Sequence, residues 1–322
     1  MLRPRIGRQK SALAGKNIVV TGGGRGLGLQ IAREAARRGA RIGLCARVGA
    51  ELEAAQRELE ASGAKVVTCV CDVREDASVE AAFARFETEL GPADALFNVA
   101  GIIGVGPIEA LALSDFRAAL ETNFLGAVRA TYAVLPGMRA RKSGAIVNVT
   151  SIGGAIAVPH MLPYCASKFA LLGFSEALHA EVARDGVRVT TIVPGLMRTG
   201  SPPHATFAGQ AKKEYALFAL GDATPITSVS VEHAAKLIVA GCERGAARVV
   251  VSWQAKLALL INRISPALMR ETLTLAGRVL PRGGDRPQHQ SGFASESVAT
   301  ASPINVLSKE ASETQNETIA PT

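Results

Sequence analysis

The chain has 322 residues, of which 48% are hydrophobic and 4% aromatic, and its formal net charge is +8. This apolar content excludes a wholly disordered chain and is ample for one large α/β domain or two smaller ones. Most of the charge lies at the ends, with +5 in residues 1–16 and +4 in residues 256–286, so we expect no nucleic-acid partner, which would need a basic surface with interleaved aromatic residues.

Residues 1–15 read as a basic N-terminal tail without the apolar run that a signal peptide needs, so we expect a cytoplasmic protein. The five cysteines are odd in number and match no zinc-ligand spacing, so no metal site is expected. Cys69 and Cys71 lie in an apolar run and are expected to be small buried side chains.

Seven short β-rich runs alternate with helical segments between Lys16 and Trp253. The runs are 17–22, 40–46, 65–73, 95–101, 144–151, 187–195 and 247–253, and helices are predicted at 28–39 and 78–91, each ending at a glycine suited to a left-handed cap. Alternation predicts βαβ units, and nearly continuous apolar runs predict strands covered on both faces. We therefore predict an α/β fold, a Rossmann-type doubly wound parallel seven-stranded sheet with helices on both faces, over residues 16–255.

Residues 144–167 contain no charged residue over 24 positions, a length that could span a membrane. The segment nevertheless includes Asn148, Thr150, Ser151, a glycine pair and two prolines. Such residues favour a strand over 144–150, then a loop and a helix, so no membrane span is expected here.

The glycine-rich segment Thr21–Gly28 (TGGGRGLG) joins the first predicted strand to the first helix. Glycines allow a tight turn and close approach of the backbone to a pyrophosphate, and a helix N-terminus offers free N–H groups and a positive dipole end. Its place between strand and helix predicts a dinucleotide-binding turn, with a merely structural turn as the alternative.

Further motifs follow this turn in a fixed order. They are NVAG at 98–101, Asn123 within ETNFLG, Ser151 at the end of the fifth predicted strand, YCASK at 164–168 and PG at 194–195. Together with T-G-x-x-x-G-x-G they make residues 16–253 resemble the short-chain dehydrogenase/reductase family. Val99 departs from the family pattern, which has a second Asn at that position.

Tyr164 and Lys168 are four residues apart, so on a helix their side chains share one face. A phenol with a pKa near 10 is a poor proton carrier at neutral pH. We expect the ammonium of Lys168 to favour the phenolate and to lower the pKa of Tyr164 by about three units, which would make it a usable acid and base.

The resemblance implies a role for each matching residue. Ser151 would orient the substrate oxygen, Tyr164 would exchange its proton, Lys168 would also hold the nicotinamide ribose, and Asn123 would support a water relay to Lys168. The implied cofactor-binding residues, beside Tyr164 and Lys168, are Gly22, Gly24, Arg25, Gly26, Leu27, Arg47, Asp72, Val73, Asn98, Ala100, Gly101, Pro194, Gly195 and Thr199. Among these, Asp72 and Val73 would lie against the adenine, and Thr199 would contact the carboxamide.

The end of the second predicted strand indicates the cofactor. NAD enzymes place an Asp there to bind the ribose 2′-hydroxyl, whereas this chain has Ala46 and Arg47, with Arg25 in the glycine turn. Guanidinium groups suit a 2′-phosphate, so NADP(H) is preferred over NAD(H). The alternative is that Arg47 is solvated or paired with Glu51.

Residues 200–230 form a long connection, and connections of this length are usually functional; the resemblance implies a substrate lid at this position. Its apolar residues either line a pocket or pack on the domain: Phe207, Tyr215, Leu217, Phe218 and Leu220. His160, in the loop before Tyr164, is an alternative acid–base residue, but it is more simply a pocket or surface residue.

Residues 256–282 form a predicted amphipathic extension. Leu257, Leu260, Ile261, Ile264 and Leu268 follow helical spacing beside a basic stripe of Lys256, Arg263 and Arg270, and Pro266 is predicted to begin a second helix. This extension could lie on a membrane surface, dock a partner subunit or cover its own domain. Residues 283–322 are polar and are predicted to be disordered.

We therefore predict an NADP(H)-dependent oxidoreductase that interconverts a secondary alcohol and a ketone on a small apolar substrate, with Tyr164 as the acid and base. A 3-oxoacyl-chain ketoreductase is one alternative, and a cofactor-binding regulator without turnover is another. The complete Asn-Ser-Tyr-Lys set argues against the regulator. The predicted partners are the substrate, a homodimer or homotetramer, and a membrane surface at which the cytoplasmic protein would be peripheral.

Overall fold

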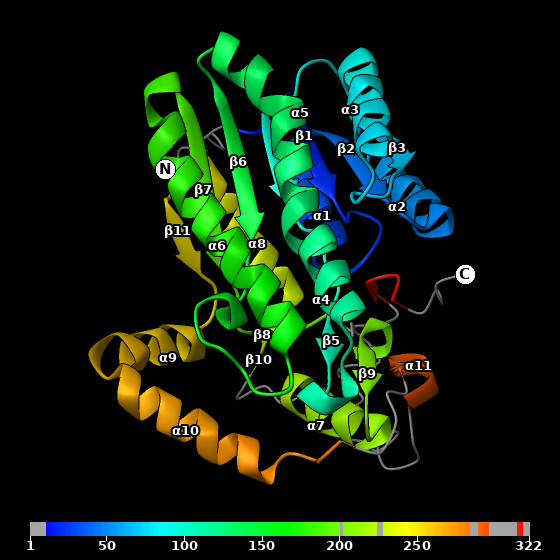
Figure 1. Cartoon of the computed structure of the whole chain (residues 1–322). Coiled ribbons are helices and arrows are strands. Elements are labelled where there is room, and N and C mark those ends of the chain that lie inside the picture. Colours follow the sequence, from blue (N-terminus) through cyan, green and yellow to red (C-terminus); the bar gives the residue numbers. More distant parts are fainter. Residues whose placement is uncertain (1–10, 200–201, 224–227, 284–288, 296–313, 318–322) are drawn as a thin grey trace, which may run out of the picture.

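Each of the seven predicted runs contains one strand of a single sheet in the computed structural model of the protein (Figure 1). The structure describes residues 11–199, 202–223, 228–283, 289–295 and 314–317, so most of the basic tail lies outside the described residues. The strands of this sheet are β1 (Asn17–Thr21), β2 (Arg41–Ala46), β3 (Val66–Val70), β4 (Ala95–Asn98), β6 (Gly144–Val149), β7 (Val187–Val193) and β11 (Arg248–Val250). The helices around it are α1 (Gly26–Arg37), α2 (Gly49–Ala61), α3 (Asp76–Leu90), α4 (Leu113–Leu120), α5 (Gly126–Ala140), α6 (Leu162–Val182) and α8 (Val231–Arg244).

The strand order is β11-β7-β6-β4-β1-β2-β3, and every neighbouring pair is parallel. The chain moves outward from β1 to β3 and then returns to the other side of β1 with β4. This reversal confirms the predicted doubly wound sheet. It also places the switch point, where such sheets bind ligands, at the carboxyl ends of β1 and β4.

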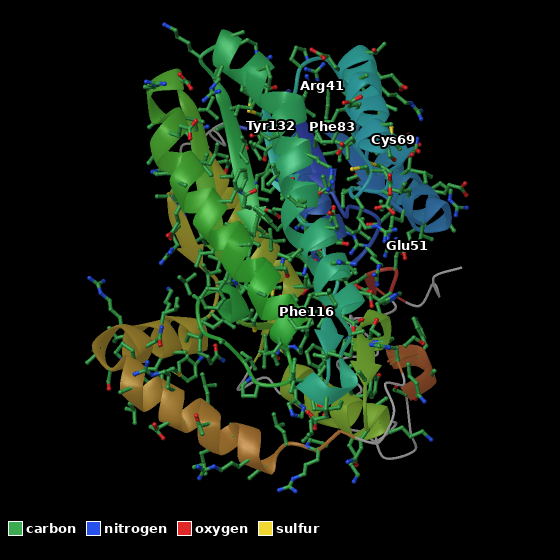
Figure 2. All side chains as sticks on the ribbon, viewed as in Figure 1. Arg41, Glu51, Cys69, Phe83, Phe116 and Tyr132 are labelled. Carbon is green, nitrogen blue, oxygen red and sulfur yellow. The ribbon has the colours of Figure 1, made fainter. Side chains whose placement is uncertain are left out.

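Helices cover both faces of the sheet, as the continuous apolar runs predicted (Figure 1). On one face α1, α2 and α8 contribute buried residues such as Leu29, Leu52 and Ile238. On the other face α3, α5 and α6 contribute Phe83, Met138 and Leu178. The five cysteines, all buried and unpaired, are part of this interior. Figure 2 shows the side chains of these layers, with Phe83 labelled.

A buried chain of polar side chains crosses one face of the sheet. Asn98 on β4 donates to Asn148 Oδ1 on β6 at 2.9 Å, and Asn148 donates to Ser175 Oγ on α6 at 3.0 Å. Ser175 in turn shares a hydrogen bond of 2.7 Å with Thr191 on β7. These groups have lost their water, so each depends on the next one, and the chain fixes α6 against the sheet.

The predicted lid region contains short elements and one helix. They are a 3-10 turn (Pro202–His204), β9 (Thr206–Ala208), α7 (Ala211–Ala223) and β10 (Ser228–Ser230); β9 pairs with β5 (Gly104–Val105), and β10 pairs with β8 (Leu196–Arg198). Phe207 and Tyr215 are buried against each other, with ring centroids 5.4 Å apart, whereas Leu217 is 47% exposed. Most of the apolar side chains therefore pack in a small core within the predicted lid region, and that of Leu220 lies outside the described side chains.

The extension forms two helices, α9 (Trp253–Ile264) and α10 (Pro266–Val279), below the carboxyl ends of the strands (Figure 1). Pro266 begins the second helix as predicted, and Ser265 Oγ caps it by accepting the Leu268 N–H at 3.3 Å. Ala255 is the buried residue of α9, and α10 has none.

The predicted disorder of residues 283–322 is wrong for two parts of that segment. β12 (His289–Ser291) pairs antiparallel with β9 and leads into α11 (Gly292–Ser295). Residues 314–317 pack against the glycine turn, where Gln315 and Glu317 are buried. Backbone pairing and these polar contacts hold segments that composition alone marks as disordered. None of the helices that the structure describes is long and apolar enough to cross a membrane.

Candidate active site

The glycine turn lies at the carboxyl end of β1, beside the end of β4. Gly22 has φ +69°, and a Cβ atom there would lie 2.8 Å from the backbone of Ala100. Gly28 is closer still, because its Cβ would lie 2.0 Å from the Gly22 carbonyl oxygen. Only glycine fits at these two positions, so the turn can bring bare backbone up to a ligand.

The N-terminus of α1 follows this turn. Gly26 and Leu27 begin the helix, its first turn contains no acidic residue, and no side chain caps it. The first turn of a helix has N–H groups without partners inside the helix and a positive dipole end, and here these lie at the carboxyl edge of the sheet, which suits an anion.

Ser151, Tyr164 and Lys168 come together as predicted. Ser151 follows β6, and its Oγ accepts the Gly153 N–H at 3.0 Å, which orients the hydroxyl. Tyr164 and Lys168 lie one turn apart on α6, with the ammonium 5.8 Å from the centre of the tyrosine ring. The end of one strand and the face of one helix thus build the candidate catalytic group.

The pKa of Tyr164 differs from the prediction. Burial of the phenol raises the pKa to about 12, and a hydrogen bond with Ser151 opposes this rise only in part. The predicted lowering is therefore wrong for this structure. The reason is geometric, because the Lys168 ammonium donates to the carbonyl oxygen of Val149 at 2.9 Å and not to the phenol.

Lys168 is itself buried, with 5% of its surface exposed. Burial disfavours the charged form and lowers the pKa of Lys168 to about 8. The side chain therefore changes charge near neutral pH, whereas the phenol of Tyr164 stays protonated.

Asn123 is placed by a π-helical turn, Glu121–Leu125, between α4 and α5. Its Oδ1 accepts the Ile102 N–H at 2.7 Å, and its Nδ2 donates to the Ile102 carbonyl oxygen at 3.0 Å and to Ser167 Oγ at 2.9 Å. A Cβ added to Gly101 would lie 3.1 Å from Asn123 Oδ1 and 3.6 Å from Lys168 Nζ. Asn123 and Lys168 therefore flank the same glycine, a placement that the sequence motif does not reveal.

A cleft of about 180 Å³ extends from the glycine turn along the ends of β2 and β4. Among the residues that line it are seven of the predicted cofactor residues: Gly22, Gly24, Arg25, Arg47, Val73, Ala100 and Gly101. The structure thus brings together much of the predicted dinucleotide site, although these residues are dispersed over eighty positions of the chain.

Arg25 and Arg47 have different surroundings in this cleft. Arg25 Nε lies 3.4 Å from Glu51 Oε1, and its guanidinium also pairs with Glu317. Arg47 is exposed at the edge of the cleft. The acid that was suggested as its partner, Glu51, pairs with Arg25 instead. Glu51, labelled in Figure 2, is 3% exposed, and burial raises its pKa.

Other predicted cofactor residues are held by contacts of their own. Asp72 pairs with Arg74, which lowers its pKa, and lies next to the cleft residue Val73. Asn98 belongs to the buried polar chain of the sheet, so its side chain does not face the cleft.

The predicted residues after β7 border the same edge of the sheet. The Pro194 carbonyl oxygen accepts the Ile152 N–H at 2.7 Å and so joins this loop to the one that follows Ser151. Gly195 lies against Ser252, where a Cβ would be 2.6 Å from the hydroxyl oxygen. Thr199 is buried, and its N–H donates to the Met197 carbonyl oxygen at 2.9 Å.

His160, the alternative acid–base residue, contacts the predicted lid region. Its Nδ1 lies 2.8 Å from Glu214 Oε1 on α7, and its carbonyl oxygen accepts the Gly106 N–H at 2.7 Å. Its φ of +63° marks a tight turn before α6. These contacts join His160 to α7 and to the residue that follows β5, which sequence spacing could not indicate.

Two acidic residues of the cleft region were not predicted as site residues. Glu51 was considered only as a partner for Arg47, and Glu317 lay in the predicted disordered tail. Glu51 could have been found from the sequence, because it lies four residues after the basic residue Arg47. Nothing near Glu317 in the sequence indicates its position, because its partner Arg25 is 292 residues away.

Comparisons with known proteins agree with this geometry. The family model described as short chain dehydrogenase matches residues 16–205. The oxidoreductase SadH of Mycobacterium tuberculosis is 36% identical over 257 residues, 79% of this chain and 92% of SadH. A protein named as a ketoacyl reductase in Streptomyces coelicolor is 40% identical over 183 residues, 56% of this chain and 70% of that protein.

The fold is also similar to that of a solved structure. L-sorbose reductase from Gluconobacter frateurii, crystallised with NADPH and L-sorbose, superposes with a TM-score of 0.67 at 30% identity and covers 76% of this chain and 97% of its own. The matched family model spans more than half of the chain and includes the glycine turn, Ser151 and the Tyr164–Lys168 pair. The chain therefore belongs to the short-chain dehydrogenase/reductase family of oxidoreductases.

Proposed function

We propose that the protein is an NADP(H)-dependent oxidoreductase that interconverts a ketone and a secondary alcohol, with Tyr164 as the proton donor and acceptor. The observation that carries the proposal is the meeting of Ser151, Tyr164 and Lys168 at the same sheet edge as the glycine turn. A regulator that only binds a dinucleotide would need the turn but not a tyrosine one helical turn away from a buried lysine.

The residues present fit a dinucleotide. Gly22 and Gly28 leave room for bare backbone, and the first turn of α1 offers N–H groups without a competing acid of its own. Lys168, whose ammonium lies beside the cleft residue Gly101, would hold ribose hydroxyls, and Arg47 is exposed at the cleft edge for a 2′-phosphate. When bound, the nicotinamide supplies or accepts the hydride.

The chain's own residues would handle the proton. With a pKa of about 12, Tyr164 is neutral at physiological pH and can donate to a carbonyl oxygen as it becomes an alkoxide. Ser151, oriented by Gly153, would hold that oxygen by a second hydrogen bond. The charged form of Lys168 would stabilise the phenolate that remains, and Asn123 would position a water that returns the proton.

Partly buried apolar side chains favour an apolar substrate. Ile103, Met161 and Phe218 border the lid core, and Met161 lies three residues before Tyr164. A ketoacyl substrate is the second candidate, supported by the 40% identical ketoacyl reductase relative. Assays of NADPH oxidation with apolar ketones and with a 3-oxoacyl thioester separate the two.

The first prediction concerns the proton donor. In Tyr164→Phe the ring remains and only the hydroxyl is lost, so turnover should fall by about 100-fold or more. NADPH affinity should stay within about threefold, because Lys168 is intact. Steady-state rates and NADPH fluorescence titration measure the two effects. A variant that keeps most of its rate would overturn the assignment of Tyr164.

The second prediction concerns pH. Because the folded pKa of Lys168 is lowered to about 8, its charge is present below that pH and is lost above it. The kcat/KM of carbonyl reduction should therefore fall as pH rises through about 8, while Tyr164 stays protonated. In Lys168→Arg the charge persists, so the alkaline fall should disappear even though the rate is lower. An unchanged profile in this variant would assign the fall to another group.

The third prediction concerns the cofactor. Arg25→Ala combined with Arg47→Ala should weaken NADPH binding by about tenfold or more, because charge-assisted contacts to the 2′-phosphate are lost. NADH affinity should change much less. Arg57→Ala, an exposed arginine outside the cleft, is the matched control. Equal losses for both cofactors would show that these arginines do not read the 2′-phosphate.

A further inference from the structure

The helical extension exposes a row of large apolar side chains. On α9 they are Trp253, Leu257, Leu260 and Ile264, and on α10 they are Leu268, Leu275 and Val279, with exposed fractions from 47% to 80%. Their spacing of three, four and seven residues puts those of each helix on one face. A 14-residue helix with no buried residue and such a face is incomplete without something to cover it.

Basic residues flank this apolar face. Lys256, Arg263 and Arg278 each precede an exposed apolar residue by one position, and Arg270 and Arg282 add two more charges. All five are exposed, and within the part of the chain that the structure covers none of them forms an ion pair. The helices contain a single acidic residue, Glu271.

We propose that α9 and α10 dock on an anionic lipid surface. The apolar face would enter the boundary between headgroups and acyl chains, and the flanking cations would meet the lipid phosphates and carboxylates. A second copy of the chain is the less suitable occupant, because a self-complementary contact would bring the same unpaired cations together.

The extension is fixed next to the active-site loops. A Cβ added to Gly277 on α10 would lie 3.7 Å from Pro159, in the loop that leads to Tyr164. The Gly283 N–H donates to Glu109 at 2.9 Å, and Gln210 donates to the Arg282 carbonyl oxygen at 2.8 Å. A bilayer under α10 would thus border the loops around the site, where an apolar substrate dissolved in lipid could enter.

Vesicle sedimentation of the full chain tests the proposal. Binding should be strong to vesicles of phosphatidylcholine with phosphatidylserine, weak to phosphatidylcholine alone and reduced by salt. Leu268→Ser, Leu275→Ser and Val279→Ser together should reduce partitioning by about tenfold or more, since apolar burial is lost. The exposed Val70, on the edge strand β3, gives the control Val70→Thr.

Charge variants complete the test. Arg263→Gln with Arg278→Gln should reduce binding to the anionic vesicles, whereas Lys212→Gln with Lys213→Gln, exposed on α7, should not. Equal partitioning of all variants, or no binding by the unaltered chain, would overturn the proposal. A serine triple variant that turned a dimer into a monomer in analytical ultracentrifugation would assign the face to a second copy instead. Circular dichroism confirms that each variant is folded.

A second observation lies at the other side of the molecule, where residues 314–317 contact the glycine turn. The Gly26 N–H, at the start of α1, donates to the Gln315 carbonyl oxygen at 2.9 Å, and Asn316 Nδ2 donates to the Gly24 carbonyl oxygen at 3.2 Å. The Glu317 carboxylate pairs with Arg25. A carboxylate of the chain thus lies where the helix N-terminus favours an anion.

The segment is held from several sides. His204 Nε2 lies 3.0 Å from the Glu317 carboxylate, and Arg33 donates to Gln315 Oε1 at 3.2 Å. Gln315 Nε2 donates to Glu232 on α8 at 3.2 Å. Gln315 is fully buried and Glu317 is 3% exposed, so the side-chain contacts of these two residues are shielded from water.

We infer that residues 314–317 compete with the dinucleotide phosphates for the glycine turn, an inference that rests on the proposed function. Cofactor binding would then require the Glu317 carboxylate to leave Arg25 and the start of α1. The apparent affinity of the full chain for the dinucleotide would then equal its intrinsic affinity multiplied by the fraction of time for which the segment leaves the turn free.

Calorimetric titration with NADPH tests this competition without any turnover. A chain ending at Glu313 should bind NADPH about tenfold more tightly than the full chain, and Glu317→Gln should give part of that gain. Glu243→Gln, a carboxylate that pairs with Arg38 away from the turn, is the control. Equal or weaker binding by the shortened chain would overturn the competition. If neither chain bound NADPH or NADP⁺, the proposed function itself would fail.

Discussion

The candidate site depends on one buried charge, the ammonium of Lys168. An ammonium that is 5% exposed needs partners, because removing it from water is costly. It finds one in the Val149 carbonyl oxygen at the end of β6, and it faces Gly101 beside Asn123. The end of a strand, the helix α6 and the π-helical turn must therefore meet around one charge, which fixes their positions relative to one another.

The same constraint explains the tyrosine. Since the lysine donates to the backbone, only the hydrogen bond with Ser151 opposes the cost of desolvating the phenolate, and the pKa of Tyr164 rises. Spacing four residues apart on a helix correctly placed Tyr164 and Lys168 on one face. It could not tell which acceptor the ammonium would choose, because Val149 lies 19 positions earlier in the chain and reaches the lysine only through the packing of α6 on the sheet.

The fold was largely predictable from local pattern. Continuous apolar runs bounded by glycine and proline are typical of strands covered on both faces, and all seven became parallel strands. The predicted helix ends at Gly39 and Gly91 were also close, and both glycines have positive φ. Pro266 began a helix because proline suits a first turn.

The parts that could not be predicted depend on contacts between distant residues. Asn98 belongs to a family motif and was predicted to bind the cofactor, yet its side chain donates a hydrogen bond to Asn148 on the neighbouring strand. Residues 314–317 have the composition of a solvated tail and are held instead by Arg25, Arg33 and His204, each more than a hundred positions away. The sequence could not tell whether the apolar residues of the predicted lid line a pocket or pack on the domain. The packing of Phe207 against Tyr215 shows that these two side chains form part of a core.

The charges around the cleft connect cofactor choice to the C-terminal segment. Arg25 lies between two carboxylates, Glu51 and Glu317, whereas Arg47 is exposed. An arginine already neutralised by acids attracts a phosphate less than a free one does. On the proposed competition, departure of Glu317 would remove one of these acids and increase the attraction of Arg25 for an incoming phosphate. At the start of α1, a phosphate of the cofactor would then replace the Glu317 carboxylate as the anion beside Arg25, so release of the segment and binding of the cofactor would occur together.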